Sequence, residues 1–160
     1  VRRVLHGGPD RRSSSFRGLT FLMEEFSPSD IVLIHDAARP LVSKRLISDC
    51  VAAAKDCGAC LAAVPASDTI YECGERGAVK RVPDRNSLFA AQTPQGFRLS
   101  LIYEGHKNIL PEIPVTDDAS ILVAQGVPVR LIPGEAWNLK VTSPEDIPVA
   151  EAYLRENFAK

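Results

Sequence analysis

The sequence lacks the features that a membrane-spanning or secreted protein needs. No apolar run approaches the roughly 20 residues that cross a bilayer, and the opening stretch, VRRVLHGG, has no apolar core of a secretory signal. Neither sign of charge dominates, because 19 lysines and arginines stand against 20 aspartates and glutamates. Broad binding to nucleic acid or to a membrane surface needs a basic excess and is not expected. We expect a cytoplasmic protein with no nucleic-acid or membrane partner, in which a local basic site for a small anion is still permitted.

Two familiar nucleotide-binding signatures are also missing. The chain contains neither the G-x-G-x-x-G of dinucleotide folds nor the G-K-[ST] of a P-loop. Histidine is scarce: apart from the pair His35–Asp36 there are only His6 and His106, neither with an acidic neighbour in sequence. This scarcity argues against a metal-dependent phosphohydrolase, and we interpret His35 as a half-buried side chain with satisfied hydrogen bonds.

The four cysteines form no complete metal or redox motif. Cys57 and Cys60 make a C-x-x-C, but Gly58 between them is typical of a helix end, whereas a thioredoxin-type pair opens a helix. A structural zinc site would need a second pair at suitable spacing. We therefore expect four free thiols in a reducing compartment.

The apolar pattern alternates between short continuous runs and helical spacing, which predicts an α/β fold. Such runs are typical of strands in a mostly parallel, Rossmann-like open sheet with helices on both faces. The first half of the chain predicts strands over residues 1–6, 31–34 and 59–65 and helices over residues 13–26 and 44–57, the second helix capped by Ser43 and ended by Gly58.

Residues 68–82 break this pattern and predict an inserted β-hairpin around GERG. A hairpin of this kind often serves as an arm that reaches a neighbouring subunit. Residues 84–97 are expected to return the chain to the body of the domain. The remainder predicts helices over residues 98–107 and 117–125, strands over 127–134 and 138–141, and a last helix with Ser143 as its cap and Pro144 as its first residue. We expect a single domain over residues 1–160.

Polar residues follow the predicted strands at the edge where open α/β sheets bind ligands. The segment HDAARP after residues 31–34 places Asp36 at a strand end, a suitable position for a carboxylate facing Mg²⁺. Three basic residues, Arg39, Arg85 and Lys140, lie beside turn-forming residues and suit phosphate contacts. Thr93 and Thr116 could add neutral donors, although each of these residues alone is equally well explained as a surface charge or a cap.

Six segments together resemble a known family. They are GGPDRRSSSFRGL, HDAARP, the dipeptide DT, DRNSLFAAQTPQGF, TDDAS and NLKVTSPED. In this order they are similar to the motifs of 2-C-methyl-D-erythritol 4-phosphate cytidylyltransferases, and the resemblance covers nearly the whole chain. A sister family that uses ribitol 5-phosphate shares several of these motifs and is the alternative for the substrate.

The resemblance implies a nucleotidyltransferase whose substrates are CTP and a sugar-alcohol phosphate, with Mg²⁺ as cofactor, in isoprenoid precursor biosynthesis. It implies that the sugar phosphate attacks the α-phosphorus of CTP, mainly with positioning and charge stabilisation from the protein. By this resemblance, Arg85 and Lys140 position the sugar phosphate, with Thr93 and Thr116 beside them. Asp36 and Arg39 lie at the reaction centre, near magnesium. The residues implied to bind the cytidine side are Gly8, Asp10, Ser14 and Ala37. The hairpin over residues 68–82 resembles a homodimerisation arm, which would bring Arg85 to the neighbouring subunit's site.

One part of the family pattern has no counterpart in the sequence. The family opens with a strand and a glycine-rich loop ending in Pro-Lys that grips the triphosphate, and this chain contains no Pro-Lys. We therefore expect an N-terminally incomplete domain that is inactive by itself. Two hypotheses remain: an enzyme whose N-terminal portion is absent from this chain, or a non-catalytic remnant that dimerises or binds sugar phosphate.

Overall fold

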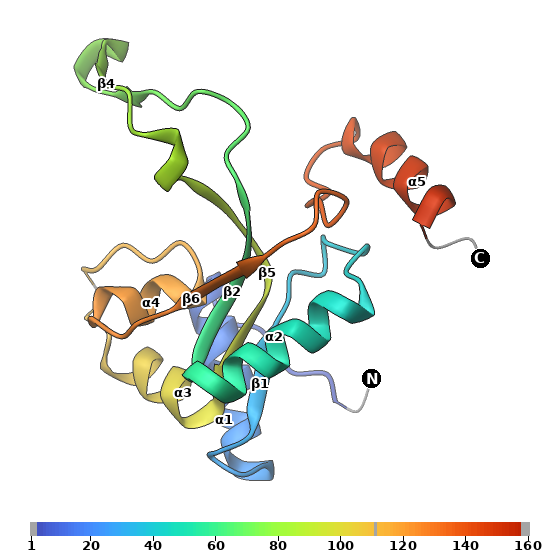
Figure 1. Ribbon diagram of the computed structural model, residues 1–160. Helices are drawn as coiled ribbons and strands as arrows, with labels where there is room; N and C mark the ends of the chain where they lie inside the picture. Colours follow the sequence, from blue (N-terminus) through green and yellow to red (C-terminus); the bar gives the residue numbers. More distant parts are fainter. Residues whose placement is uncertain (1–2, 111, 158–160) are drawn as a thin grey trace.

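The computed structural model describes residues 3–110 and 112–157 (Figure 1). The helices and strands, in chain order, are α1 (Arg11–Glu25), β1 (Ile31–Ile34), α2 (Lys44–Cys57), β2 (Ala59–Pro65), β3 (Glu72–Cys73), β4 (Val79–Arg81), β5 (Phe89–Arg98), α3 (Leu99–Asn108), α4 (Asp118–Ala124), β6 (Arg130–Pro133) and α5 (Asp146–Asn157). Short 3₁₀ turns η1 (Glu75–Gly77) and η2 (Arg85–Ser87) flank β4.

The central sheet has four strands in the order β1-β5-β2-β6. Strands β1, β2 and β6 run in the same direction, and β5 runs against its neighbours β1 and β2. The expected α/β fold, with most strands parallel in direction, is therefore confirmed. What the sequence did not predict is that an antiparallel strand separates β1 from β2.

Helices cover both faces of this sheet. Alternate residues of β2 divide between two apolar cores, because successive side chains in a strand point to opposite faces. Ala59 and Leu61 pack with buried residues of α1, α3 and α4, whereas Cys60 and Ala62 pack against α2. Phe97 of β5, fully buried, belongs to the first of these cores.

The ends of α2 follow the sequence prediction. The Ser43 hydroxyl accepts the N–H of Leu46 at 3.0 Å, and Gly58 ends the helix in the left-handed region with φ 85°. A residue with a Cβ is strained in that conformation. The four cysteines are free, with Cys57 at the end of α2 and Cys60 within β2.

Strand β5 is the element that sequence reasoning missed. Its apolar pattern is broken by Gln92, Thr93, Gln95 and Pro94, and proline is rare within a central strand. The register with β2 is irregular at this place: Leu61 pairs with Gln95 and Ala63 with Ala91. Pairing with β1 ends at Gln95. Pro94 therefore lies where no regular ladder needs an N–H donor, and its peptide bond to Thr93 is cis.

Two further predictions were wrong. Residues 3–6 form no strand, and residues 1–2 lie outside the described residues. Residues 138–141 form no strand either, because their polar groups bind the loop after β1 and the strand β5 instead.

The last helix begins at Asp146 rather than at Pro144, where the sequence predicted its start. The N–H groups of Asp146 and Ile147 first make i→i−3 hydrogen bonds to the carbonyls of Ser143 and Pro144.

The predicted hairpin is present as β3 and β4, which extend away from the body (Figure 1). Glu72 on β3 forms ion pairs with Lys80 and Arg81 on β4. Helix α5 also lies apart from the sheet in this view (Figure 1). None of the helices in the described ranges combines the length and hydropathy that a bilayer crossing requires.

Gly96 gives a test of the packing around β5. A Cβ there would lie 3.0 Å from the Cys60 sulfur and 3.1 Å from the Cys50 carbonyl oxygen. We expect Gly96→Ala to lower the free energy of unfolding in urea by about 1–3 kcal/mol through overpacking. Gly18→Ala is the control: nothing lies within 4 Å of its added Cβ on α1, so a gain of about 0.5–1 kcal/mol is expected. Equal effects of the two substitutions would contradict this account of the core.

Candidate active site

Three charged side chains meet at the carboxyl end of β1. The Lys140 Nζ lies 3.1 Å from Oδ2 of Asp36, and the Arg39 Nε lies 3.7 Å from the same oxygen. A cavity of about 250 Å³ opens beside them. Its lining consists of Arg11, Asp36, Arg39, Ala91, Gln92, Thr93, Gln95, Thr116, Asp117 and Lys140.

The loop after β1 is fixed by Thr93 and His35. The Thr93 hydroxyl accepts the N–H of Asp36 at 3.0 Å and lies 3.0 Å from Nδ1 of His35. The other ring nitrogen of His35 lies 2.9 Å from the Arg39 carbonyl oxygen. His35 thus has partners on both nitrogens, as interpreted from the sequence, but it is more exposed than expected. Its hydrogen bonds close the turn that presents Asp36 and Arg39.

Asn138 brings the segment with Lys140 to this turn. Its fully buried side chain donates to the backbone carbonyl of Thr93 at 2.7 Å, and the backbone carbonyl of Asn138 accepts an N–H from Nη1 of Arg39 at 2.8 Å. Two residues further on is Lys140. The same segment is held by the side chain of Gln92, which donates to the Glu135 carbonyl at 2.9 Å and accepts the Glu135 N–H at 3.1 Å. Gln92 and Asn138 were not singled out from the sequence, although both lie within the motifs that carry the family resemblance.

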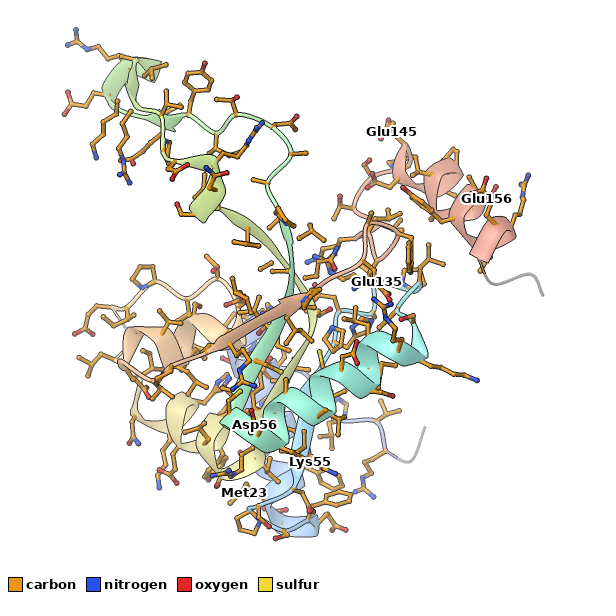
Figure 2. The ribbon with its side chains drawn as sticks, in the orientation of Figure 1. Met23, Lys55, Asp56, Glu135, Glu145 and Glu156 are labelled. Atoms are coloured by element: carbon orange, nitrogen blue, oxygen red, sulfur yellow. The ribbon has the colours of Figure 1, made fainter. Side chains whose placement is uncertain are left out.

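Glu135, labelled in Figure 2, ties this segment to α2. Its carboxylate accepts the hydroxyl of Ser43, the cap of that helix, at 2.7 Å. Arg39 is itself largely enclosed, with a side chain 12% exposed. Burial lowers the pKa of the Arg39 guanidinium from its usual value, and the carboxylate of Asp36 raises it again in part. Arginine nevertheless stays protonated at physiological pH, so the cavity has a fixed cation.

The residues expected on the cytidine side lie at the start of α1 and on the loop after β1. The Gly8 N–H donates to the Ser14 hydroxyl at 2.9 Å, and Asp10 caps the helix by accepting the Ser13 N–H at 2.6 Å. Hydrogen bonds from Ser13 lower the pKa of the Asp10 carboxyl. A Cβ on Gly8 would lie 2.3 Å from that of Ser13, so the close turn requires glycine there. Ala37 is an exposed residue of the loop after β1.

Arg85 is the predicted catalytic residue that lies outside the cavity, and the predicted cytidine-side residues Gly8, Asp10, Ser14 and Ala37 do not line it either. It begins the turn η2 at the base of the hairpin, is exposed, and donates to the Ser67 carbonyl at 3.2 Å. The structure thus brings together Asp36, Arg39, Thr93, Thr116 and Lys140 and leaves Arg85 apart from them. Their roles remain predictions.

Comparison with known proteins shows which family the chain belongs to. The sequence model of the family described as 2-C-methyl-D-erythritol 4-phosphate cytidylyltransferase (IspD) matches residues 2–156. Curated proteins of that name from Synechococcus elongatus and Alkaliphilus oremlandii are 44% and 43% identical to it over 95% and 97% of this chain. The chain belongs to this family. It spans 65% of the length of each of these two relatives.

Solved structures agree with this cytidylyltransferase family assignment. The crystal structure of 2-C-methyl-D-erythritol 4-phosphate cytidylyltransferase from Thermus thermophilus superposes with a TM-score of 0.80 at 39% identity, over 94% of this chain and 72% of that one. The 4-diphosphocytidyl-2C-methyl-D-erythritol synthase of Anaerococcus prevotii gives 0.85 at 33% identity, over 96% and 68%. The resemblance inferred from the motifs is confirmed, and the ribitol alternative gains no support from these relatives.

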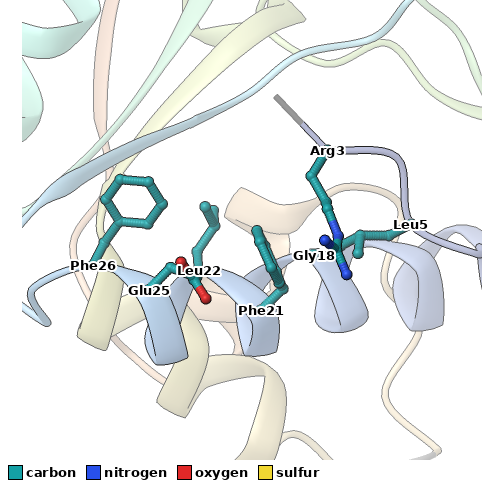
Figure 3. A pocket seen from close by; sticks show the side chains of 7 residues that line it. All are labelled: Arg3, Leu5, Gly18, Phe21, Leu22, Glu25 and Phe26. Carbon is teal, nitrogen blue, oxygen red and sulfur yellow. The ribbon is translucent and has the colours of Figure 1, made fainter. Parts of the chain in front are cut away.

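A larger hollow of about 650 Å³ lies elsewhere on this family member, along the outer face of α1 (Figure 3). Phe21, Leu22 and Phe26 line it, with Arg3 placed over the Phe21 ring at 5.8 Å. Its lining contains none of the residues predicted for catalysis or substrate binding. The smaller charged cavity is therefore the better candidate for the active site.

Beside the charged cavity lies a buried carboxylate, Asp118, at the first position of α4. It contacts Nη2 of Arg11 at 2.6 Å and Nε2 of His106 at 2.9 Å, and its side chain is 0% exposed. Burial by itself would raise the pKa of Asp118, but the hydrogen bond from His106 and the charge of Arg11 outweigh it and hold the pKa below its ordinary value.

This lowered pKa predicts acid sensitivity. Because the folded-state pKa of Asp118 lies below the unfolded one, its contribution to stability is complete at pH values above the unfolded pKa and is lost as the pH falls through the folded-state pKa. We expect Asp118→Asn to be less stable than the wild type at pH 7 and the difference to shrink at pH 3. Urea unfolding at both pH values measures it. A stability difference that stays constant or grows in acid would contradict the assignment.

Proposed function

We propose that this protein catalyses transfer of the cytidylyl group of CTP to 2-C-methyl-D-erythritol 4-phosphate, with release of pyrophosphate. The observation that carries the proposal is the convergence of Arg39 and Lys140 on Asp36 beside Thr93 in one cavity. The choice of substrates is supported by the 44% identity to a curated relative named 2-C-methyl-D-erythritol 4-phosphate cytidylyltransferase.

The reaction requires positioned cations more than covalent chemistry by the protein. A phosphate oxygen of the sugar phosphate forms a bond to the α-phosphorus of CTP, the bond from that phosphorus to the bridging oxygen breaks, and pyrophosphate leaves with the electron pair. Negative charge builds up on the transferring group and must be stabilised. Lys140 and Arg39 are proposed to do this, with Thr93 and Thr116 beside them in the cavity wall.

We further propose that Asp36 faces Mg²⁺. The described residues contain no cluster of three or more histidine, cysteine, aspartate or glutamate side chains suited to a metal. A single carboxylate fits Mg²⁺ bound mainly by substrate phosphate oxygens and water, and Asp36 is half-buried in the cavity wall. When bound, the ion would neutralise charge on those phosphate oxygens. Gly8, Asp10, Ser14 and Ala37 are proposed to bind the cytidine side.

The hairpin is proposed to join two copies into a homodimer. It exposes apolar side chains, with Ile70, Tyr71 and Val79 exposed by 44%, 55% and 59%, and exposed apolar clusters of this kind favour protein interfaces. Arg85, at the base of the hairpin and outside its own chain's cavity, would then serve the site of the neighbouring subunit. The four free cysteines support a reducing location, which we propose to be the cytoplasm.

The proposed reaction is tested by pyrophosphate release from CTP in the native protein. With Mg²⁺ present, 2-C-methyl-D-erythritol 4-phosphate should be used and ribitol 5-phosphate should not. Lys140→Gln should lower the rate by about 10²–10³-fold, because a cation at the developing charge is lost. Lys107→Gln, at an exposed lysine of α3 paired with Glu104, is the matched control. Full activity of Lys140→Gln would remove Lys140 from the mechanism. Absence of turnover by a wild-type protein that carries the family's N-terminal glycine-rich loop would overturn the proposed function.

Subunit complementation tests the placement of Arg85. Arg85→Ala and Lys140→Gln should each be nearly inactive alone. If each site combines its own Lys140 with the partner's Arg85, equal mixing and reassociation should restore about a quarter of wild-type activity, because half the dimers are mixed and each has one intact site. Absence of any recovery, with mixed dimers verified by mass, would show that Arg85 acts within its own chain.

A further inference from the structure

Arg11 contributes a third cation to the cavity. It lies within the segment GGPDRRSSSFRGL, but no role was assigned to it from the sequence. It is the first residue of α1, and it lines the cavity together with Asp36, Arg39 and Lys140. Its side chain is 42% exposed. One nitrogen, Nη2, contacts Asp118, and no other described residue forms a hydrogen bond with Nε or Nη1. The N–H of Nε, both N–H groups of Nη1 and the second N–H of Nη2 therefore remain for a ligand.

Asp118 fixes the direction of this guanidinium. The carboxylate is fully buried, and its second oxygen accepts the Nε2–H of His106, itself fully buried between α3 and α4. The His106 ring stacks on Phe16, with centroids 5.8 Å apart and planes 7° apart. A buried carboxylate held at both oxygens can adopt few other positions. Arg11 is thus anchored from within the core, and the entropy cost of ordering its side chain on ligand binding is reduced.

The acids of the cavity leave these donors available. Asp36 is already paired with Lys140 and Arg39. Asp117 caps α4 by accepting the Ser120 N–H at 2.8 Å and also accepts the Gln95 amide at 2.6 Å. Among the described residues, the ion pair of Arg11 is with Asp118 and not with Asp36 or Asp117.

We propose that Arg11 binds a phosphate group of the substrates in this cavity, and that Asp118 and His106 are positioning residues for it. The second N–H of Nη2 forms a fork of parallel donors with either Nε–H or Nη1–H, and such a fork matches two oxygens of one phosphate, a contact that a lysine cannot reproduce. The phosphate belongs either to CTP or to the sugar phosphate, so the proposal rests on the proposed function for its ligand.

Calorimetric titration of the native protein with CTP, with 2-C-methyl-D-erythritol 4-phosphate and with inorganic phosphate tests the proposal. Arg11→Gln should weaken binding of one of the two substrates by about 10- to 100-fold, which is the loss of a charge-assisted hydrogen bond, and the substrate affected identifies the source of the phosphate. Arg11→Lys keeps the charge beside Asp118 but loses the fork, so it should retain wild-type stability and still bind more weakly. Arg12→Gln is the control, because Arg12 donates to the Ile109 carbonyl at 3.1 Å and does not line the cavity.

The outcomes separate this proposal from the proposed function. Wild-type affinity of Arg11→Gln for all three compounds would overturn the role of Arg11 and leave the function standing. Binding of inorganic phosphate that Arg11→Gln loses, with both substrates ignored by the wild type, would support Arg11 and overturn the function. No wild-type binding of any of the three would overturn both.

The positioning role is tested at His106. His106→Gln retains an N–H donor for Asp118, whereas His106→Leu removes it. We expect the leucine variant to raise KM for the substrate that Arg11 binds with little change in kcat, and the glutamine variant to restore KM towards the wild-type value. Two variants of equal stability with equal KM would show that His106 serves only the packing of α3 against α4.

Discussion

Strand β5 is the constraint on which the site depends. It is inserted antiparallel between β1 and β2, and three of its polar side chains are buried. Gln92 binds the backbone of Glu135, Thr93 binds the backbone of Asp36, and Gln95 binds Asp117 at 2.6 Å and the backbone of Ala119 at 3.0 Å. Each of these three side chains holds a different segment of the chain against the sheet by hydrogen bonds. Because a buried polar group without a partner costs about 1–3 kcal/mol, none of these segments can leave the strand without a penalty.

This arrangement explains how distant motifs meet in one cavity. Asp36 follows β1, Lys140 follows β6 and Thr116 precedes α4, so no local sequence feature brings them together. The irregular register between Leu61 and Ala63 shifts β5 relative to β2 where its polar residues begin. Irregularities of this kind redirect side chains near functional sites. Backbone and amide groups hold the loops in place, so in the proposed function the cations need little further ordering when a phosphate binds.

Local signals in the sequence were sufficient for the helices, for β1, β2 and β6, and for the hairpin of β3 and β4. Ser43 and Gly58 marked the ends of α2, and continuous apolar runs marked β1 and β2. The pattern could not predict β5, because its conformation depends on neighbours far away in the chain that bury its glutamines and threonine. Residues 138–141 show the opposite failure. Their alternation of polar and apolar residues suits a strand, but their polar groups form hydrogen bonds to the loop after β1 and to β5 instead. Every residue of the cavity wall lies within a motif of the resemblance. The anchoring of Arg11 nevertheless required the structure, since only Asp118, 107 positions away, reveals it.

The electrostatics of the cavity follow from the same design. Asp36 and Asp118 each hold a cation in place, but in different surroundings: Asp36 is partly open, with a side chain 21% exposed, and Asp118 is sealed at 0%. A sealed carboxylate cannot bind a metal or exchange partners with solvent, so it can only orient Arg11. In the proposed function, a partly open one releases Lys140 to a substrate phosphate and turns its oxygens to a metal ion. The depth of each carboxylate is set by whether it follows a strand at the sheet edge or begins a helix packed on α3, and it determines whether the carboxylate is open to a ligand or only positions a neighbouring side chain.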